Sequence, residues 1–279
     1  EDDYRYREFT QAGLELIGEK SYLADAEVIM LAVDALKAAG LTDFLIEVGN
    51  TEFFRGLIEE CGLLKRDEEE LIRNVDKKNN LAITETLKNA GTVKSLIDVI
   101  TKLPTLFGDD AVKDAYGLVK NKKSLAALDE IGKLCDILRS SGYEKYVSVD
   151  LSLLNNMNFY TGTIFKGITS HFGAPILSGG RYNNLFTSAK GGEAIPATGF
   201  AVGIKNLLTA LKASGQTVKK PPCDYVIGAK KKYAEKAFET KKKLTEQGFI
   251  VNYTFIDDEN KLAKYAKETA ARNIIFIDR

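Results

Sequence analysis

The chain has 279 residues, of which 44% are hydrophobic and 28% are charged. This composition is typical of a soluble globular protein with one large domain or two ordinary ones. Lysine plus arginine and aspartate plus glutamate both number 39, so the net charge is zero. Because nucleic-acid binders usually carry a basic excess or stripe, this balance argues against a nucleic-acid partner, and the lysine clusters are interpreted as solvated surface.

Three cysteines and one histidine limit the chemistry open to the chain. Cys61, Cys135 and Cys223 are far apart and odd in number, which argues against a disulfide framework and favours a reducing, cytoplasmic location. No Cys-x-x-Cys pair accompanies His171, so we expect no structural metal site. No apolar run approaches the roughly 18 residues of a membrane span, so no membrane association is expected.

The first elements in chain order predict a sheet with helices on its faces. Residues 8–17 alternate apolar and polar as a strand does, and Gly18 ends the run. Residues 25–39 have apolar positions at helical spacing, with Gly40 as the stop signal. Residues 44–49 form a second predicted strand, and the order strand, helix, strand favours a mixed sheet packed against helices.

The segment from about residue 52 to 142 has a different character. Helical periodicity dominates it, and Pro104 and several glycines divide it into short helices. The predicted helices cover residues 53–61, 67–79, 81–89, 93–103, 110–118 and 124–140. We interpret this segment as a helical insertion between the two halves of a sheet domain.

Strands return after the insertion. They are predicted at residues 146–151, 161–168, 174–177 and 197–203, and a helix follows at 205–214. Short connections that contain glycine favour antiparallel pairing of these strands. The sheet domain is therefore expected to span residues 1–214.

The last part of the chain is predicted to be a second domain. Residues 215–222 are expected to be a linker, and residues 223–279 alternate strand and helix in βαβαβ order. That order predicts a small parallel α/β domain. Because the chain begins without methionine and ends on a strand, we expect a fragment of a longer protein, with this domain truncated.

A glycine-rich motif, Ser178-Gly179-Gly180-Arg181-Tyr182, is the first candidate binding element. Adjacent glycines let the backbone approach a ligand closely, and the arginine and tyrosine beside them could contact a carboxylate and an aromatic group. A hairpin turn with a cross-strand tyrosine explains the same motif equally well.

Four ordered segments place this motif in a wider pattern: residues 5–18, 158–165, 178–183 and 196–204. Together they resemble the histidyl-tRNA synthetase family, from Arg5 to about Leu211, and the C-terminal domain resembles that family's anticodon-binding domain more loosely. The resemblance implies an α+β fold of the class II synthetase type, with an antiparallel sheet flanked by helices and a helical insertion.

The resemblance also implies a pocket for an amino acid. Gln11 and Glu15 lie four residues apart on one predicted strand, so their side chains share a face. Glu15 is expected to pair with a ligand's ammonium group, and Gln11 to form a hydrogen bond beside it. Tyr160 and Tyr182 match pocket tyrosines of the family and are expected to contact an imidazole, with Arg181 beside them. Polar positions on a sheet surface are the alternative interpretation.

The departures from the family pattern concern catalysis. Asn155 and Asn206 stand where the synthetases carry arginines, and Asn158 and Phe159 replace an Asp-Tyr pair. Arginine is always charged and binds oxyanions with two parallel hydrogen bonds, whereas asparagine has no charge. Because one preorganised charge donor is worth on the order of 100-fold in rate, we expect no amino-acid activation and no catalytic residues.

This combination resembles the regulatory subunits of ATP phosphoribosyltransferase, a non-catalytic group related to the synthetases. The resemblance implies a part in the first step of histidine biosynthesis: a short catalytic subunit as partner, histidine as effector and no cofactor. It also implies a homodimer within a larger hetero-oligomer. A divergent histidyl-tRNA synthetase and a synthetase-like RNA-sensing module are the alternatives.

Overall fold

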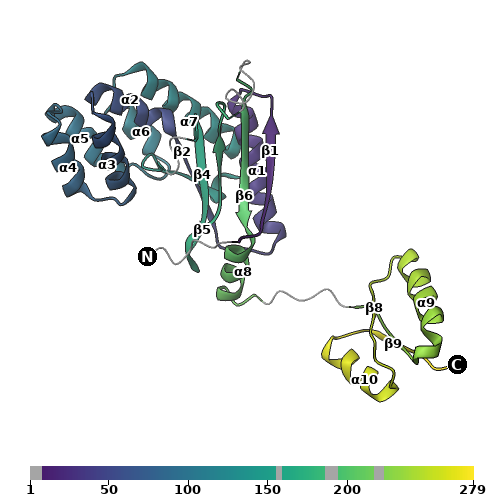
Figure 1. Ribbon diagram of the computed structural model, residues 1–279. Helices are drawn as coiled ribbons and strands as arrows, with labels where there is room; N and C mark the ends of the chain where they lie inside the picture. Colours follow the sequence, from purple (N-terminus) through teal and green to yellow (C-terminus); the bar gives the residue numbers. More distant parts are fainter. Residues whose placement is uncertain (1–7, 155–158, 186–193, 217–222) are drawn as a thin grey trace. The chain divides into compact units, whose positions relative to one another are not determined.

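The computed structural model describes residues 8–154, 159–185, 194–216 and 223–279. The chain divides into two compact units, residues Glu1–Gln216 and Thr217–Arg279 (Figure 1). None of the helices in the described ranges is long and apolar enough to cross a membrane.

A six-stranded sheet is the centre of the first unit. Its strand order is β1-β6-β5-β4-β2-β3, and all neighbouring pairs are antiparallel except β2 with β3. The predicted antiparallel sheet is therefore confirmed. The strands are β1 (Gln11–Ile17), β2 (Leu45–Asn50), β3 (Val147–Val149), β4 (Thr163–Thr169), β5 (Phe172–Arg181) and β6 (Ala197–Gly203).

One face of this sheet, which we call the covered face, packs against helices. Leu14, Phe165 and Phe200 point to this side and share a hydrophobic core with α1 (Tyr22–Ala38), α7 (Lys122–Ser140) and α8 (Ile204–Ala213). Because successive side chains of a strand point to opposite faces, the intervening residues form the other side, the open face. Along β1 the open-face residues Gln11 and Glu15 are exposed, whereas Leu14 is half-buried.

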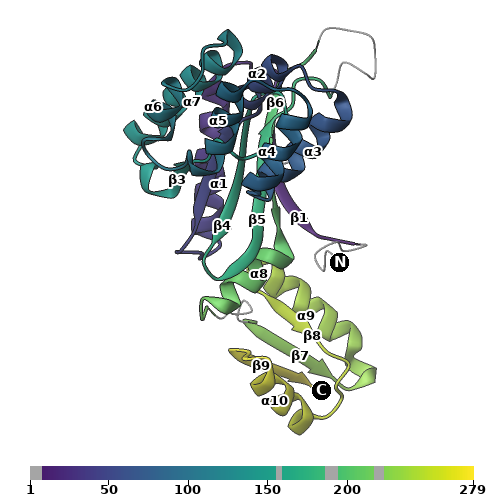
Figure 2. The ribbon, with the colours of Figure 1, turned by 90° about the vertical axis from the view of Figure 1, so that its left-hand side faces the viewer.

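The helical insertion lies beside the β2 and β4 side of the sheet and has a hydrophobic core of its own (Figures 1 and 2). Asn50 caps its first helix by accepting a hydrogen bond from the Glu52 backbone N–H at 2.9 Å. Gly62 ends that helix in the left-handed conformation. The helices are α2 (Thr51–Cys61), α3 (Lys65–Asp76), α4 (Asn80–Asn89), α5 (Lys94–Lys102), α6 (Ala111–Tyr116) and α7, with a 3-10 turn at Leu103–Thr105.

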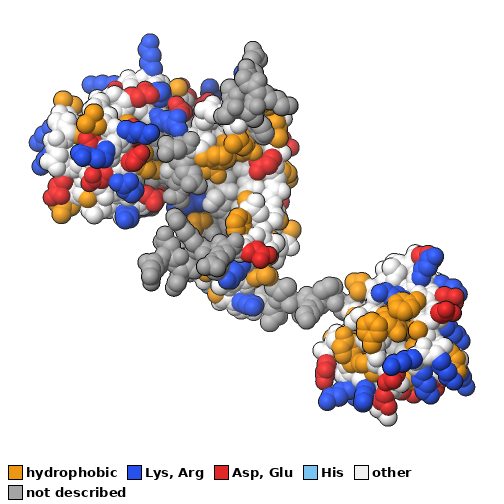
Figure 3. Space-filling view, in the orientation of Figure 1, with side chains coloured by type: hydrophobic (Ala, Val, Ile, Leu, Met, Phe, Trp, Pro, Cys, Tyr) orange, Lys and Arg blue, Asp and Glu red, His pale blue; other side chains and the backbone are white. Residues whose placement is uncertain are grey.

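The second unit is a three-stranded parallel sheet, of order β8-β7-β9, with two helices. Its elements are β7 (Tyr225–Ala229), α9 (Ala234–Glu246), β8 (Val251–Tyr253), α10 (Glu259–Glu268) and β9 (Asn273–Ile277). Hydrophobic side chains gather on the face of this unit seen in Figure 3. Its exposed large hydrophobic residues include Phe238, Phe249, Ile250, Phe255 and Ile274.

Candidate functional site

The open face has a floor that is nearly free of side chains between Gln11 and Glu15. Only Gly13 lies between these two residues on the open face of β1. On the neighbouring strand β6, Gly203, Ala201 and Gly199 pair in register with Gln11, Gly13 and Glu15. No side chain larger than a methyl group therefore lies on the open face between the polar side chains of Gln11 and Glu15 on these two strands.

Glu15, Tyr160 and Tyr182 form a cluster at one end of this floor, the Glu15–Tyr cluster. The Tyr182 hydroxyl donates a hydrogen bond to the Glu15 carboxylate. Gly199 makes room for that carboxylate, because a Cβ built there would lie 1.8 Å from a Glu15 carboxylate oxygen. Tyr160 and Tyr182 are both buried, at 9% and 6% exposure.

Both tyrosines of the cluster are held in their neutral form. Burial raises the pKa of Tyr182, and so does the hydrogen bond to Glu15. Burial is also the main cause of the raised pKa of Tyr160, followed by the nearby negative charge of Glu15. The cluster thus combines the Glu15 carboxylate, which can accept from a cationic or N–H donor, with two neutral phenols.

Phe159 closes the cluster with its aromatic ring. It stacks on Tyr182 with ring centroids 5.1 Å apart and meets Tyr160 edge-on at 5.0 Å. The residue Phe159 is 44% exposed. Phenylalanine at this position packs an aromatic ring on both tyrosines and adds no hydroxyl. Asn158, where a second departure from the family pattern is expected, lies outside the described residues.

Arg181 does not join this cluster. It precedes Tyr182 directly, and alternation along β5 places its side chain on the covered face. There its Nε donates a hydrogen bond to Oδ2 of Asp25 in α1 at 3.0 Å, and its Nη2 lies 3.0 Å from the other carboxylate oxygen as an ion pair. Its remaining donors reach the backbone carbonyls of Glu19 and Ser21 at 2.9 and 3.0 Å. The expectation that Arg181 lies beside the pocket tyrosines is therefore corrected.

Gln11 lies on the same face of β1 as Glu15, as expected, but at the other end of the strand. Four residues at a rise of about 3.3 Å separate their Cα atoms by about 13 Å. Gln11 pairs in register with Gly203, at the junction of β6 and α8. One ligand lying along the floor could therefore contact each side chain with a different end.

Asn206, the position expected to have lost an arginine, lies in the first turn of α8. Its Nδ2 donates a hydrogen bond to the backbone carbonyl of Pro175 at 2.8 Å. This amide therefore ties α8 to β5 and brings no charge to that end of the sheet. Asn155, the other such position, lies outside the described residues.

Thr51 and Arg55 of α2 contact the backbone of the segment that carries Tyr160, and sequence reasoning did not predict this contact. The Thr51 backbone N–H donates to the Gly162 carbonyl at 2.9 Å, and the Arg55 guanidinium donates to the Tyr160 carbonyl at 3.2 Å. These contacts join positions more than 100 residues apart, so the local sequence pattern around either position does not predict them.

The glycine-rich motif is part of a strand and not a turn. Gly179 and Gly180 pair with Phe165 and Ile164 of β4 and with Phe200 and Gly199 of β6. Strand β5 is thus longer than predicted, since it runs through the two glycines to Arg181. The hairpin alternative for this motif is excluded.

A cavity of about 160 Å³ lies elsewhere, beside the edge strand β3. Its lining combines residues of α7 with β3 and the segment before α6, and includes none of the predicted site residues. Among the described residues, no group of three or more His, Cys, Asp or Glu is arranged to hold a metal ion.

Comparison with known proteins identifies the family. The family model described as histidyl-tRNA synthetase matches residues 1–207. The chain belongs to the histidyl-tRNA synthetase family. A crystal structure of an ATP phosphoribosyltransferase regulatory subunit/histidyl-tRNA synthetase from Bacillus halodurans superposes with a TM-score of 0.77 at 30% identity, over 97% of this chain and 69% of that one. The class II synthetase-like fold is confirmed.

Curated relatives in this family agree with the predicted resemblance to its regulatory group. An ATP phosphoribosyltransferase regulatory subunit of Ruminiclostridium cellulolyticum is 37% identical over 98% of this chain, and one of Acetivibrio thermocellus is 40% identical over 88%. The chain spans 65% and 59% of the lengths of these relatives. A histidyl-tRNA synthetase from Nostoc, with a TM-score of 0.75 at 20% identity, shares the fold.

Proposed function

We propose that this member of the histidyl-tRNA synthetase family is a regulatory subunit of ATP phosphoribosyltransferase that binds histidine without activating it. The observation that carries the proposal is the contrast between the two ends of the open face. The Glu15–Tyr cluster at one end keeps a carboxylate and two phenols in contact. The other end has the neutral amide of Asn206, already bonded to Pro175.

Histidine has a length and chemistry that suit the floor between Gln11 and Glu15. Its imidazole, with an N–H donor and an aromatic ring, would lie in the Glu15–Tyr cluster, where Glu15 accepts from the ring N–H. The α-amino end would extend along the side-chain-free floor toward Gln11. This placement differs from the expected pairing of Glu15 with the ammonium group, because the aromatic rings of Tyr160 and Tyr182 lie beside Glu15.

A sensor of this kind regulates only if histidine binds one state of an assembly better than another. We propose that the protein assembles, as a homodimer, with a short catalytic subunit of ATP phosphoribosyltransferase, activates it, and transmits histidine inhibition to it. The names of the relatives support this partner, and the resemblance in sequence supports the homodimer. Conversion of ATP and phosphoribosyl pyrophosphate would take place on the partner.

Calorimetric titration of the purified protein with histidine tests the binding site. Glu15→Gln keeps the shape of the side chain and removes its charge, so the dissociation constant should rise about 10- to 100-fold, the value of one charge-assisted hydrogen bond. Glu27→Gln is the matched control, because Glu27 is exposed on α1, the helix of the covered face. Equal affinities for wild type and Glu15→Gln would rule out the open face as the histidine site.

Histidine-dependent exchange of pyrophosphate into ATP separates the proposal from the synthetase alternative. A regulatory subunit should show no exchange above background, and it should raise the activity of a short catalytic subunit when the two are mixed. Appreciable exchange would identify an active synthetase. Binding of a transfer RNA, with neither exchange nor activation, would favour the RNA-sensing alternative.

A further inference from the structure

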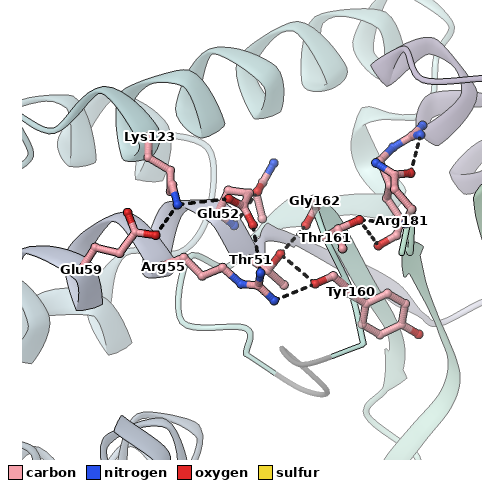
Figure 4. Close-up of polar contacts among 11 residues, drawn as sticks. Thr51, Glu52, Arg55, Glu59, Lys123, Tyr160, Thr161, Gly162 and Arg181 are labelled. Carbon is pink, nitrogen blue, oxygen red and sulfur yellow. Dashed lines mark hydrogen bonds and ion pairs between the residues drawn. The ribbon is translucent and has the colours of Figure 1, made fainter. Parts of the chain in front are cut away.

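The first turns of α2 hold the backbone of the segment that carries Tyr160. The Thr51 hydroxyl lies 3.4 Å from the Tyr160 carbonyl and 3.3 Å from the Gly162 carbonyl. The Thr51 N–H and the Arg55 guanidinium donate to the same two carbonyls. Figure 4 shows these side chains directed at the Tyr160 carbonyl while the Tyr160 ring projects away from α2.

The same segment is tied on its other side to the strand that carries Tyr182. The Thr161 N–H donates to the Arg181 carbonyl at 2.7 Å, and the Thr161 hydroxyl accepts from the Asn183 N–H at 2.9 Å. Both tyrosines of the Glu15–Tyr cluster are therefore fixed to one short stretch of backbone. A shift of that stretch would move the Tyr160 ring relative to Glu15.

Helix α2 packs closely against α7, so we expect a displacement of one helix to displace the other. The Ser124 hydroxyl donates to the Phe53 carbonyl at 2.7 Å, and a Cβ built on Gly56 would lie 2.4 Å from the Ser124 hydroxyl. Phe53 is fully buried in the core of the insertion, which includes residues of both helices. Close packing of this kind transmits a displacement and does not absorb it.

Charged groups extend the connection along the surface of the two helices. Arg55 pairs with Glu52 at 3.5 Å, and Glu52 lies 3.9 Å from Lys123 at the start of α7. Lys123 also pairs with Glu59, one helical turn beyond Arg55 on α2 (Figure 4). A continuous series of contacts thus leads from the Tyr160 carbonyl to α7.

We infer that α2 couples occupancy of the Glu15–Tyr cluster to the helical insertion, with Thr51 and Arg55 as the positioning residues for Tyr160. The inference rests on the proposed function, since the ligand is histidine on the open face. The ring of Tyr160 meets the ligand and its carbonyl meets α2, so one residue contacts both the ligand and the insertion. Coupling is reciprocal, so if histidine stabilises α2, loosening α2 weakens histidine binding.

The test uses the purified protein and four variants. Arg55→Met removes the guanidinium group. Thr51→Val removes the hydroxyl group at nearly constant side-chain volume, whereas Thr51→Ser retains the hydroxyl group. Arg139→Met is the matched control, because Arg139 also makes an i,i+3 pair, with Asp136 at 2.9 Å, and both side chains are exposed on α7. Circular dichroism establishes that each variant is folded.

Two measurements are made on each protein: the histidine dissociation constant and the change in amide hydrogen exchange caused by histidine. We expect Arg55→Met and Thr51→Val to raise the dissociation constant about tenfold, and Thr51→Ser and Arg139→Met to leave it within about twofold. In wild type, histidine should slow exchange in α2 and α7. In Arg55→Met at saturating histidine, the slowing should be confined to the strands of the open face.

The possible outcomes distinguish this inference from the proposed function. If the wild type binds histidine and the Arg55→Met and Thr51→Val variants bind it equally tightly, the coupling is overturned and the histidine site remains supported. The coupling is also overturned if histidine slows amide exchange in α2 and α7 of Arg55→Met as much as it does in the wild type. Absence of histidine binding by the wild type overturns both proposals. If Arg55→Met does not fold, Thr51→Val and Thr51→Ser decide the question.

Discussion

The two faces of the six-stranded sheet use the same strands for different purposes. The covered face contributes Leu14, Phe165 and Phe200 to a core shared with three helices. The open face presents Glu15 and Tyr182 above glycines and an alanine. Because successive side chains of a strand point to opposite faces, the contacts that hold Arg181 on the covered face also fix the neighbouring Tyr182 on the open face. Rigidity on one face thus positions polar groups on the other.

Each face also has an ion pair, and the two pairs differ in burial. Asp25 and Arg181 on the covered face are almost fully buried, with side-chain exposures of 3% and 6%. Glu47 and Lys166 on the open face lie 3.0 Å apart and retain 20% and 24% exposure. A buried charge that loses its partner cannot be solvated, whereas a partly exposed one can turn to water.

The largest expected effect follows from breaking the pair of the covered face. Arg181→Met leaves the Asp25 carboxylate buried without its partner, and should lower the free energy of unfolding by about 3–5 kcal/mol. Lys166→Met, the matched change on the open face, should lower it by about 1 kcal/mol or less. Urea denaturation followed by circular dichroism measures both. Equal losses in the two variants would contradict the difference between the faces.

A smaller effect should follow from filling the floor of the open face. Gly199→Ala places a methyl group where the Glu15 carboxylate lies, and should cost about 1–3 kcal/mol in stability and weaken histidine binding at least about tenfold. Gly203→Ala is the control on the same face of the same strand, because its Cβ would meet no atom closer than 3.6 Å. Unfolding and calorimetric titration measure the two quantities. Retention of full histidine affinity in Gly199→Ala would place the ligand elsewhere.

The sequence predicted the fold better than it predicted the site, and Arg181 explains why. The order of strands and helices follows from local periodicity, which survives in single segments. The side of a sheet on which a residue lies depends on the extent of the strand, and two glycines concealed the extent of β5. Once β5 is known to reach Arg181, alternation alone separates Arg181 from Tyr182.

The contribution of α2 was missed for a different reason. Thr51 and Arg55 meet Tyr160 only because the insertion folds back beside β4, and 105 residues separate Arg55 from its partner. The acceptors are the backbone carbonyls of residues 160 and 162, and every residue type has such a carbonyl, so the residue types at these positions do not reveal the contact. Glu15 and Tyr182 could be predicted because their own side chains carry the chemistry.

Tyr182→Phe tests the hydrogen bond that joins the two strands of the cluster. Loss of the hydroxyl donor to Glu15 should lower the free energy of unfolding by about 1 kcal/mol at neutral pH. Histidine affinity should fall about fivefold, because the Glu15 carboxylate is no longer oriented. Phe159, which stacks on the same ring, keeps its contact in this variant. An unchanged stability would show that the hydroxyl is equally well solvated in the unfolded chain.

The same variant has a predicted signature in the pH dependence of stability. Burial and the bond to Glu15 raise the pKa of Tyr182, so the folded protein keeps this proton above pH about 10, where the unfolded chain loses it. The stabilisation is complete below pH about 10 and is lost as pH rises toward the folded pKa. Denaturation at several alkaline pH values should show a shallower decline for Tyr182→Phe than for wild type. A parallel decline would exclude a raised pKa at Tyr182.

The smallest effect is expected at the other end of the sheet, where Asn206 joins α8 to β5. Asn206→Ala removes the 2.8 Å hydrogen bond to the Pro175 carbonyl, and should cost about 0.5–1.5 kcal/mol because the amide is only half-buried. Histidine affinity should stay within about twofold, since the bond fastens a helix of the covered face and the Glu15–Tyr cluster lies at the opposite end of the floor. Thermal unfolding and calorimetric titration give the two values. A clear loss of histidine affinity would mean that the ligand extends beyond Gln11 to α8, and the proposed contrast between the Glu15–Tyr cluster and the Asn206 end would fail.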